Sequence, residues 1–212
     1  MLAVAGVAWL IYSLLHHRNR AQTDYLTGIS NRGYVFEHGF RLGDRALKNN
    51  EPLSLALLDL DHFKKINDTL GHEAGDKALI AAVEAVKKVV KRGDIFGRLG
   101  GEEFVVVMRD CDREEAGKRG DEIRLAVAGA GFLHAGKHPV NFTVSVGVAV
   151  IDPSCDFQTL VNRADEALYV AKNSGRNKVV MASSTAERLS EGFSTVGSRQ
   201  RVRQDDALST YR

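Results

Sequence analysis

Charged side chains gather in three short segments that follow or join apolar runs. The first is Asp59-Leu60-Asp61, in which Asp59 ends an apolar run and would present its carboxylate at the edge of a sheet. A carboxylate at the end of a buried strand is costly unless a cation or hydrogen bonds compensate its charge. We interpret Asp59 as a cation-binding residue and Asp61 as the N-cap of a following helix.

The second segment, Gly100-Gly101-Glu102-Glu103-Phe104, joins two apolar runs as a hairpin turn. Paired glycines allow the backbone to approach a ligand closely. Adjacent glutamates repel each other, but they are useful where a divalent cation is bound, because Mg²⁺ takes oxygen ligands from carboxylates and phosphates. Solvated turn charges are the alternative interpretation.

Basic residues form the third group, with Lys172 and Arg176 in one segment and Lys64 in another. Near the acidic groups, such cations suit a polyphosphate whose charge is shared between a metal and basic side chains. The residues therefore indicate metal-dependent chemistry on a nucleoside triphosphate. They leave open which nucleotide is used, and whether hydrolysis, transfer or cyclisation follows. The sequence has no Walker-type Gly-x-x-x-x-Gly-Lys, which counts against a P-loop enzyme.

Interleaved helices and strands must position these groups. Apolar spacing and capping residues predict helices over residues 31–49, 73–92, 112–128 and from Asp156 to just before Gly175. Short apolar or alternating runs predict five strands, over residues 53–59, 95–99, 104–108, 142–150 and 178–181. The interleaved order predicts an α+β fold, an α/β sandwich around one mixed sheet. The histidines at 134 and 138 are expected in a loop.

Composition is typical of one globular domain with tails: 212 residues, 44% hydrophobic and 26% charged, with a formal net charge of +2. So small a charge gives no reason to expect nucleic acid as a partner. The two distant cysteines, Cys111 and Cys155, indicate a reducing compartment. Residues 183–212 are rich in Ser, Thr, Arg and Gln and are expected to be a disordered tail.

The N-terminus differs from the rest of the chain, because residues 1–15 are almost wholly apolar and a basic cluster follows them. The run is shorter than the roughly 20 residues that span a bilayer. It fits the end of a spanning helix or a short anchor; a signal peptide and a buried soluble helix fit less well. We expect membrane association, with residues 16–23 as a juxtamembrane linker and the remainder in the cytoplasm.

Several motifs in register resemble the GGDEF-domain diguanylate cyclases, over residues 24–182. Besides the acidic turn, they are the segments Asp24-Tyr25-Leu26-Thr27-Gly28-Ile29-Ser30-Asn31-Arg32, Asp59 to Asp68, Gly71-His72, Gly75-Asp76, Thr143 to Ala149, and Ala164-Asp165 through Lys172 to Gly175-Arg176-Asn177. This resemblance implies a mainly antiparallel central sheet flanked by helices, as in nucleotidyl cyclase and polymerase palm domains.

The resemblance also implies roles for the acidic residues. Asp59, the carbonyl of Leu60, Glu102 and Glu103 match the family's Mg²⁺ site, which Mn²⁺ also suits. Glu102 matches the group that deprotonates the attacking 3′-hydroxyl.

The remaining matched positions concern the nucleotide. Asn67 and Asp76 match the pair that reads guanine, and Lys64 matches the residue that stabilises charge at the phosphates. Lys172 and Arg176 match further phosphate contacts. The implied reaction joins two GTP molecules into cyclic di-GMP and releases pyrophosphate. Because one domain holds one GTP, the resemblance implies a homodimer with facing catalytic domains.

One position departs from the family pattern. Many members carry Arg-x-x-Asp before the Gly-Gly turn as a product-inhibition site, but here Lys91 stands where the arginine would be, with Asp94 in place. Lysine lacks the planar fork of arginine, so we predict weak or absent product inhibition. Two other functions remain open: a catalytically silent domain that binds GTP or cyclic di-GMP, and a cyclase with a mixed guanine–adenine product.

Overall fold

The computed structural model describes residues 22–136 and 138–184. The apolar run 1–15, most of the 16–23 linker and nearly all of the predicted tail lie outside these residues. Within the described part, no helix is long and apolar enough to cross a membrane.

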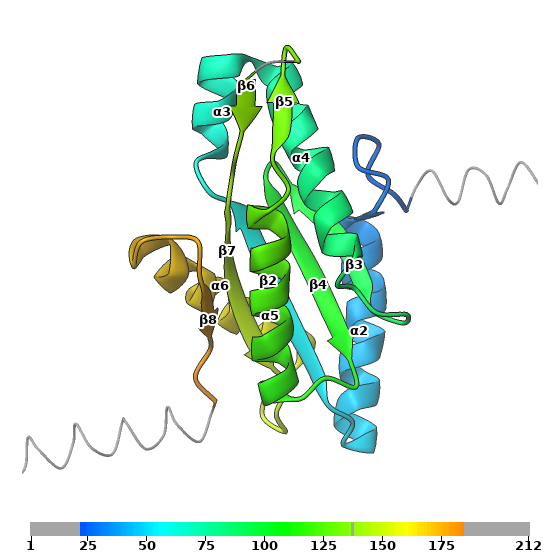
Figure 1. Ribbon diagram of the computed structural model, residues 1–212. Helices are drawn as coiled ribbons and strands as arrows, with labels where there is room; N and C mark the ends of the chain where they lie inside the picture. Colours follow the sequence, from blue (N-terminus) through cyan, green and yellow to red (C-terminus); the bar gives the residue numbers. More distant parts are fainter. Residues whose placement is uncertain (1–21, 137, 185–212) are drawn as a thin grey trace, which may run out of the picture. The chain divides into compact units, whose positions relative to one another are not determined.

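A six-stranded sheet runs through the centre of the fold (Figure 1). Its strands, in spatial order, are β1 (Ser30–Asn31), β3 (Ile95–Gly100), β4 (Glu103–Arg109), β2 (Leu53–Leu60), β7 (Val144–Val150) and β8 (Val179–Met181). The inner pairs are antiparallel, whereas the outermost pairs, β1 with β3 and β7 with β8, are parallel. The mainly antiparallel α+β fold is therefore confirmed.

The central sheet has one strand more than the five predicted. Strand β1 has two residues and no alternating pattern, so its pairing with β3 leaves no signal in the sequence. A separate hairpin, β5 (Phe132–His134) and β6 (His138–Val140), was also missed. His134 ends β5 and His138 begins β6, and the two residues pair across the strands rather than lying in a loop.

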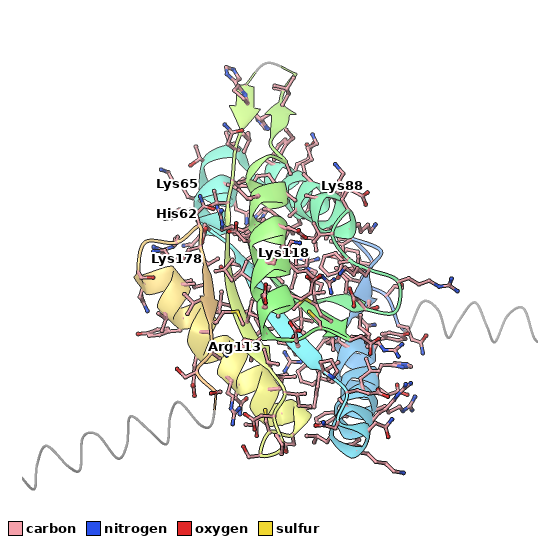
Figure 2. All side chains as sticks on the ribbon, turned by 60° about the horizontal axis from the view of Figure 1, so that its bottom comes forward. His62, Lys65, Lys88, Arg113, Lys118 and Lys178 are labelled. Atoms are coloured by element: carbon pink, nitrogen blue, oxygen red, sulfur yellow. The ribbon has the colours of Figure 1, made fainter. Side chains whose placement is uncertain are left out.

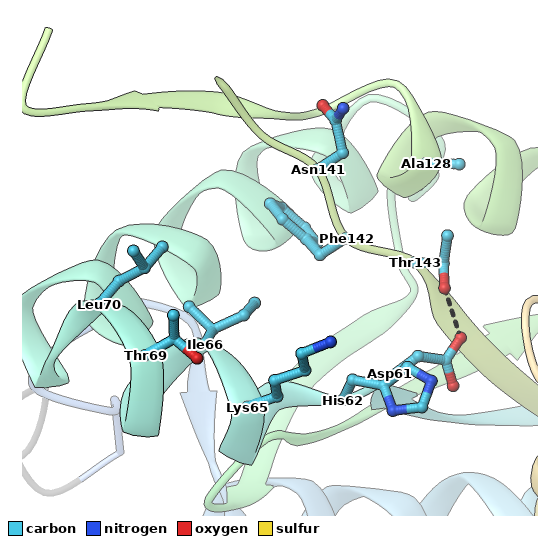
Figure 3. A pocket seen from close by; sticks show the side chains of 10 residues that line it. All are labelled: Asp61, His62, Lys65, Ile66, Thr69, Leu70, Ala128, Asn141, Phe142 and Thr143. Atoms are coloured by element: carbon cyan, nitrogen blue, oxygen red, sulfur yellow. Dashed lines mark hydrogen bonds between the residues drawn. The ribbon is translucent and has the colours of Figure 1, made fainter. Parts of the chain in front are cut away.

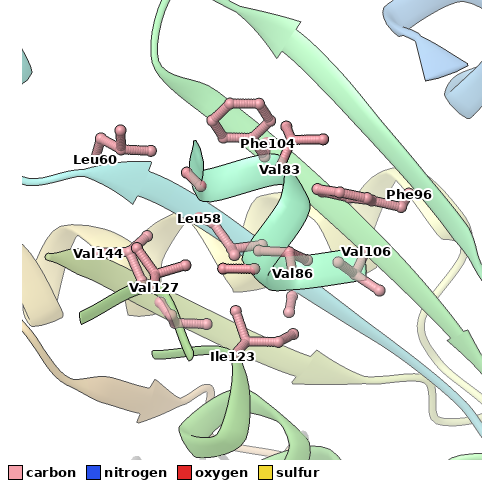
Figure 4. Packing of buried hydrophobic residues seen from close by; sticks show 14 of the residues in the cluster. Leu58, Leu60, Val83, Val86, Phe96, Phe104, Val106, Ile123, Val127 and Val144 are labelled. Carbon is pink, nitrogen blue, oxygen red and sulfur yellow. The ribbon is translucent and has the colours of Figure 1, made fainter. Parts of the chain in front are cut away.

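Helices cover both faces of the sheet (Figure 1). One face carries α4 (His72–Lys87) and α5 (Arg113–Ala128), and the other carries α2 (Arg32–Asn49) and α6 (Phe157–Asn173). The short helix α3 (Phe63–Leu70) precedes α4. Figure 4 shows the first core, where Val83 and Val86 of α4 and Ile123 of α5 meet the sheet. Because both faces are covered, every residue of β2 is buried, which explains its continuous apolar run.

Local capping explains where three of the helices begin. The side chains of Asn31, Asp112 and Asp156 accept hydrogen bonds from backbone amides in the first turns of α2, α5 and α6. Asp61 does not cap α3, whose N-cap is His62 with no side-chain hydrogen bond. That prediction was wrong, because the Asp61 carboxylate is bound elsewhere.

Candidate active site

The acidic residues meet where β2 and the β3–β4 hairpin end together. Asp59, near the end of β2, lies directly opposite Glu103, the first residue of β4. The Leu60 amide donates a 3.3 Å hydrogen bond to the carbonyl oxygen of Glu102. Antiparallel pairing therefore brings together a strand end and a turn that are about 40 residues apart, as the sequence motifs required.

The turn itself needs its two glycines. Gly100 and Gly101 have φ angles of 152° and 50°, in the region that side chains with a Cβ rarely adopt. Apart from each glycine's own neighbours in the chain, no described residue has a heavy atom within 4 Å of where a Cβ would stand at either glycine, so the backbone is open for close approach by a ligand. Glu102 is half-buried and Glu103 is exposed.

Arg98 clamps this turn, a role that the sequence did not reveal. Its Nε and Nη2 atoms donate to the Gly101 carbonyl oxygen at 3.0 and 2.7 Å. Its Nη1 atom donates to both carboxylate oxygens of Asp24, at 3.1 and 3.3 Å. Asp24 also accepts from the Thr27 amide and hydroxyl. The first motif of the chain is thereby tied to the acidic turn through one planar guanidinium.

The Asp59 carboxylate is mostly buried and lies near two other acidic side chains. Burial raises its pKa, and the neighbouring Glu102 and Glu103 raise it further, although Lys172 opposes both effects. The Lys172 ammonium lies 2.7 Å from the Asp59 carboxylate and forms an ion pair with it. The sequence had suggested phosphate contact for Lys172; in this structure its contact is the acidic centre.

The donor set suits a hard divalent cation. Asp59, Glu102 and Glu103 offer carboxylate oxygens, and their mutual repulsion is the kind that a cation relieves. Among the described residues, no three His, Cys, Asp or Glu side chains converge closely enough to hold a metal ion as they stand. Strand register therefore places the acidic residues near one another, and their charges repel. The cation that lies beside Asp59 is the Lys172 ammonium.

Helices α3 and α4 bring the proposed guanine-reading residues close together. The amide oxygen of Asn67 packs over Gly75, 1.9 Å from where a Cβ would lie. Gly75 therefore has to lack a side chain for Asn67 to lie beside the first turns of α4, next to Asp76. On the same helix as Asn67, Lys64 is 85% exposed and forms only a 3.7 Å pair with Asp68.

The loop after α6 is held to the sheet by Asp61. Its two carboxylate oxygens accept from the Thr143 hydroxyl at 2.6 Å, the Ser145 hydroxyl at 2.7 Å and the Asn177 amide at 3.0 Å. Arg176 precedes Asn177 and is exposed, and both have positive φ angles, of 61° and 44°. Asp61 thus fixes the position of the loop after α6, which contains the basic residue Arg176, relative to the end of β2.

The residues at the expected product-inhibition site are engaged within the protein. The Asp94 carboxylate accepts from the Lys91 and Arg109 amides at 2.8 and 3.1 Å, and it pairs with Arg119, with both side chains almost fully buried. The Lys91 ammonium pairs with Glu115 at 2.5 Å. The sequence gave no sign of the Arg119 partner, which lies 25 residues further along the chain.

Several relatives share most of this chain. Response regulator PleD of Caulobacter vibrioides is 41% identical over 174 residues, which are 81% of this chain and 38% of the relative. Diguanylate cyclase DgcP of Pseudomonas aeruginosa is 37% identical over 165 residues, 78% of this chain and 24% of the relative. The chain therefore spans well under half the length of these relatives.

Solved structures show the same fold. The coiled coil and GGDEF domain of DgcB from Caulobacter crescentus, in complex with c-di-GMP, aligns with a TM-score of 0.81 and 31% identity, covering 85% of this chain and 95% of that one. The active GGEEF domain of a diguanylate cyclase from Vibrio cholerae aligns with a TM-score of 0.68 and 30% identity, covering 73% and 98%. The family described as "Diguanylate cyclase, GGDEF domain" matches residues 21–178. The chain belongs to the diguanylate cyclase GGDEF-domain family.

Proposed function

We propose that this chain is an active diguanylate cyclase, which condenses two GTP molecules into cyclic di-GMP and releases two pyrophosphates. The observation that carries the proposal is the register of Asp59 against Glu103, beside an intact Gly-Gly-Glu-Glu-Phe turn that Arg98 holds. The relative from Vibrio cholerae is described as an active GGEEF domain, and this chain has the same five letters at residues 100–104.

Guanine selectivity follows from the groups on α3 and α4. The Asp76 carboxylate accepts hydrogen bonds, as guanine N1 and N2 require and as adenine does not match. Asn67, held over Gly75, supplies an amide beside it. The exposed ammonium of Lys64, together with Lys172 and Arg176 at the end of α6, offsets the charge of the triphosphate. GTP is therefore the proposed substrate at both half-sites.

The acidic centre would hold Mg²⁺ or, with the same oxygen ligands, Mn²⁺. Asp59, the Leu60 carbonyl, Glu102 and Glu103 are its proposed ligands. A cation held by these residues would supply positive charge to offset the phosphates, so that the 3′-hydroxyl could attack the α-phosphate of the other nucleotide in line. Glu102, half-buried in the turn, takes up the proton of that hydroxyl.

A homodimer is proposed because each domain carries one set of guanine-reading and phosphate-binding residues. Two domains must face each other so that each 3′-hydroxyl reaches the partner's α-phosphate. We further propose the layout of 1–15 as a membrane segment, 16–23 as a linker, 24–182 as the cyclase domain and 183–212 as a tail. The apolar N-terminal run and its basic flank support attachment to a bacterial inner membrane with the cyclase domain in the cytoplasm.

The full chain incubated with GTP and Mg²⁺ tests this function. Cyclic di-GMP identified by mass spectrometry is the expected product, formed at a specific rate that rises with protein concentration as dimers assemble. ATP added in excess should leave the product unchanged, whereas a mixed guanine–adenine product would overturn the assignment of two guanine half-sites. GTP consumption without any cyclic dinucleotide would overturn the reaction.

The ion pair between Lys172 and Asp59 favours a second candidate, a catalytically silent domain that binds GTP or cyclic di-GMP. In that case the ammonium stays on the carboxylate and no cation is held there. Such a domain would bind a labelled GTP analogue with the same affinity before and after chelation of divalent cations and would release no pyrophosphate.

A further inference from the structure

A pocket of about 480 Å³ opens beside α3 and is not used by the proposed reaction. Ile66 and Leu70 of α3 form one wall, and Phe142, just before β7, forms another, with Ala128 at the end of α5. Figure 3 shows these side chains around the opening, with Lys65 extending from α3 across it. Its volume lies within the range of about 300–1,000 Å³ that is usual for sites of small organic molecules.

The pocket and the nucleotide residues occupy opposite faces of one helix. Because α-helical neighbours recur at three and four residues, His62, Lys65, Ile66 and Thr69 fall on one side of α3. All four line the pocket. Lys64 and Asn67 fall on the other side, the side proposed to bind GTP. The pocket therefore adjoins the substrate site without being part of it.

Of the two charged side chains that line the pocket, Asp61 has partners within the protein and Lys65 has no carboxylate partner among the described residues. The Asp61 carboxylate lines it but already accepts three hydrogen bonds, from Thr143, Ser145 and Asn177. Lys65 forms no ion pair with any carboxylate among the described residues, although it stands over apolar side chains. Figure 2 places Lys65 and His62 next to each other at this edge of the molecule. A ligand that fits this pocket would therefore carry one negative group, to pair with Lys65, and an apolar part, to contact the walls.

We propose that this pocket is an effector site for a small monocarboxylate with an apolar tail, such as a medium-chain fatty acid. The tail lies against Ile66, Leu70 and Phe142, and the carboxylate pairs with the Lys65 ammonium. Burial of the tail supplies most of the affinity, and the ion pair selects the charge and the orientation of the ligand.

A ligand in the pocket would change the affinity of the nucleotide site for GTP, a consequence that rests on the proposed function. Helix α3 has no buried residue, whereas α4 buries a whole face against the sheet, so α3 is weakly fixed by comparison with α4. A ligand packed on one face of so short a helix changes the position of Lys64 and Asn67 on the other face. The ligand therefore alters the affinity for GTP.

Calorimetric titration of the full chain with octanoate tests the site without any turnover of GTP. Saturable binding is expected, and the Ala128→Phe variant, which fills the pocket from α5, should lose it; Thr69→Trp serves as a second filling variant if Ala128→Phe does not fold. Lys65→Gln should weaken octanoate about fivefold, the effect of a partly exposed ion pair. The matched control Lys88→Gln, on the exposed residue after α4, should bind octanoate as the wild type does.

Two probes, one neutral and one cationic, test whether the pocket selects a carboxylate. Octanol should bind wild type and Lys65→Gln equally, and octylammonium should bind more weakly than octanoate. Tighter binding of octylammonium, or octanoate binding that survives both filling variants, would overturn the proposal, as would the absence of saturable octanoate binding.

The link to the nucleotide is measured separately, with a non-reactive GTP analogue. Saturating octanoate should change the affinity for the analogue by about fivefold or more in the wild type and leave it unchanged in Ala128→Phe. If octanoate binds but this affinity does not change, the effector role is overturned. If the analogue does not bind at all, the proposed function fails while octanoate binding still reports on the pocket.

Discussion

At the scale of single residues, three side chains do more than their positions in the sequence suggested. Arg98 ties the acidic turn to the first motif, Asp61 holds the basic loop, and Arg119 neutralises Asp94. Each acts through a partner that is distant along the chain, so only the fold reveals it. The proposed metal-binding and substrate-binding residues lie near the backbone segments that these three contacts fix in place.

The Arg98 clamp predicts a specific catalytic defect. Arg98→Lys keeps a positive charge near Asp24 but loses the planar fork on the Gly101 carbonyl, so the turn is no longer held. We expect kcat to fall about tenfold or more with the KM for GTP changed little, because a turn displaced by even about 1 Å costs catalysis. Steady-state kinetics check this. Arg41→Lys, in an exposed pair with Glu37 on α2, is the control and should match the wild type.

Asp24 predicts a pH-dependent contribution to stability. Burial tends to raise its pKa, but hydrogen bonds from Thr27 and the charge of Arg98 outweigh burial and hold the pKa below its usual value. A group with a lowered folded-state pKa stabilises the fold above its unfolded pKa, and this contribution is lost as pH falls through the folded pKa. Asp24→Asn should therefore lower the free energy of unfolding by about 1 kcal/mol at pH 7.

Urea unfolding of both proteins at pH 7 and near pH 3 measures this effect. The difference in stability between wild type and Asp24→Asn should shrink toward zero in acid. A difference that stays constant over this range would show that the charge of Asp24 does not contribute.

At the scale of elements, the long patterned segments were predictable and the short pieces were not. Strand β2, the β3–β4 hairpin and the capped helices α2, α5 and α6 follow from apolar runs, glycines and side-chain caps. The two-residue β1 and the β5–β6 hairpin have too few residues for any periodicity to be visible. Helix α4 ends at Lys87, earlier than the predicted residue 92, because apolar Val89 and Val90 continue the pattern beyond the helix.

The same limit applies to the site. Acidic and basic groups were identified from their types and their places at strand ends, and the structure brings Asp59 and Glu103 face to face. The Asp61 assignment failed because Asx residues before a helix usually cap it, whereas here two hydroxyls from β7 and its preceding residue compete for the carboxylate. Contacts of this kind depend on strand pairing across the whole fold.

The packing of α3 on α4 predicts a matched pair of glycine substitutions. A Cβ at Gly75 would overlap the Asn67 amide, so Gly75→Ala should displace Asn67 and raise the KM for GTP, by about tenfold for one lost hydrogen bond to the base. Gly117, half-buried on α5, has only an ordinary 3.6 Å contact, with the sulfur of Met181. Gly117→Ala should leave the KM unchanged and raise stability by about 0.5–1 kcal/mol. An unchanged KM in Gly75→Ala would contradict the placement of Asn67.

The joint between β3 and α5 predicts the outcome at the product-inhibition site. Asp94→Ala would leave Arg119 buried without its partner, so stability should fall by about 3 kcal/mol or more.

Because Asp94 and Lys91 are engaged internally, cyclic di-GMP should not inhibit the wild type at this site. Calorimetry with cyclic di-GMP and thermal unfolding of both proteins provide the two measurements. Saturable product binding that disappears in Lys91→Ala, a milder variant, would contradict this prediction.

At the scale of the whole molecule, the fold places every proposed catalytic group on one edge of the central sheet. Two helical layers protect the strands, and the edge collects the ends of β2, the β3–β4 turn, α3 and the loop after α6. One such edge carries one set of the proposed nucleotide-binding residues, so the proposed chemistry needs a second copy. If the proposed function holds, regulation would act on how often two copies meet and, through the proposed effector pocket, on the position of α3.

The most direct measurement is the rate of cyclic di-GMP formation by wild type, Asp59→Ala and Glu102→Ala, with Glu37→Ala on α2 as the control. Product is expected from wild type and from Glu37→Ala, and a loss of at least about 100-fold in each acidic-centre variant, because each removes a proposed metal ligand or the proposed proton acceptor. Product formed by Asp59→Ala or Glu102→Ala at a rate close to that of wild type would contradict the account, as would a wild type that makes none.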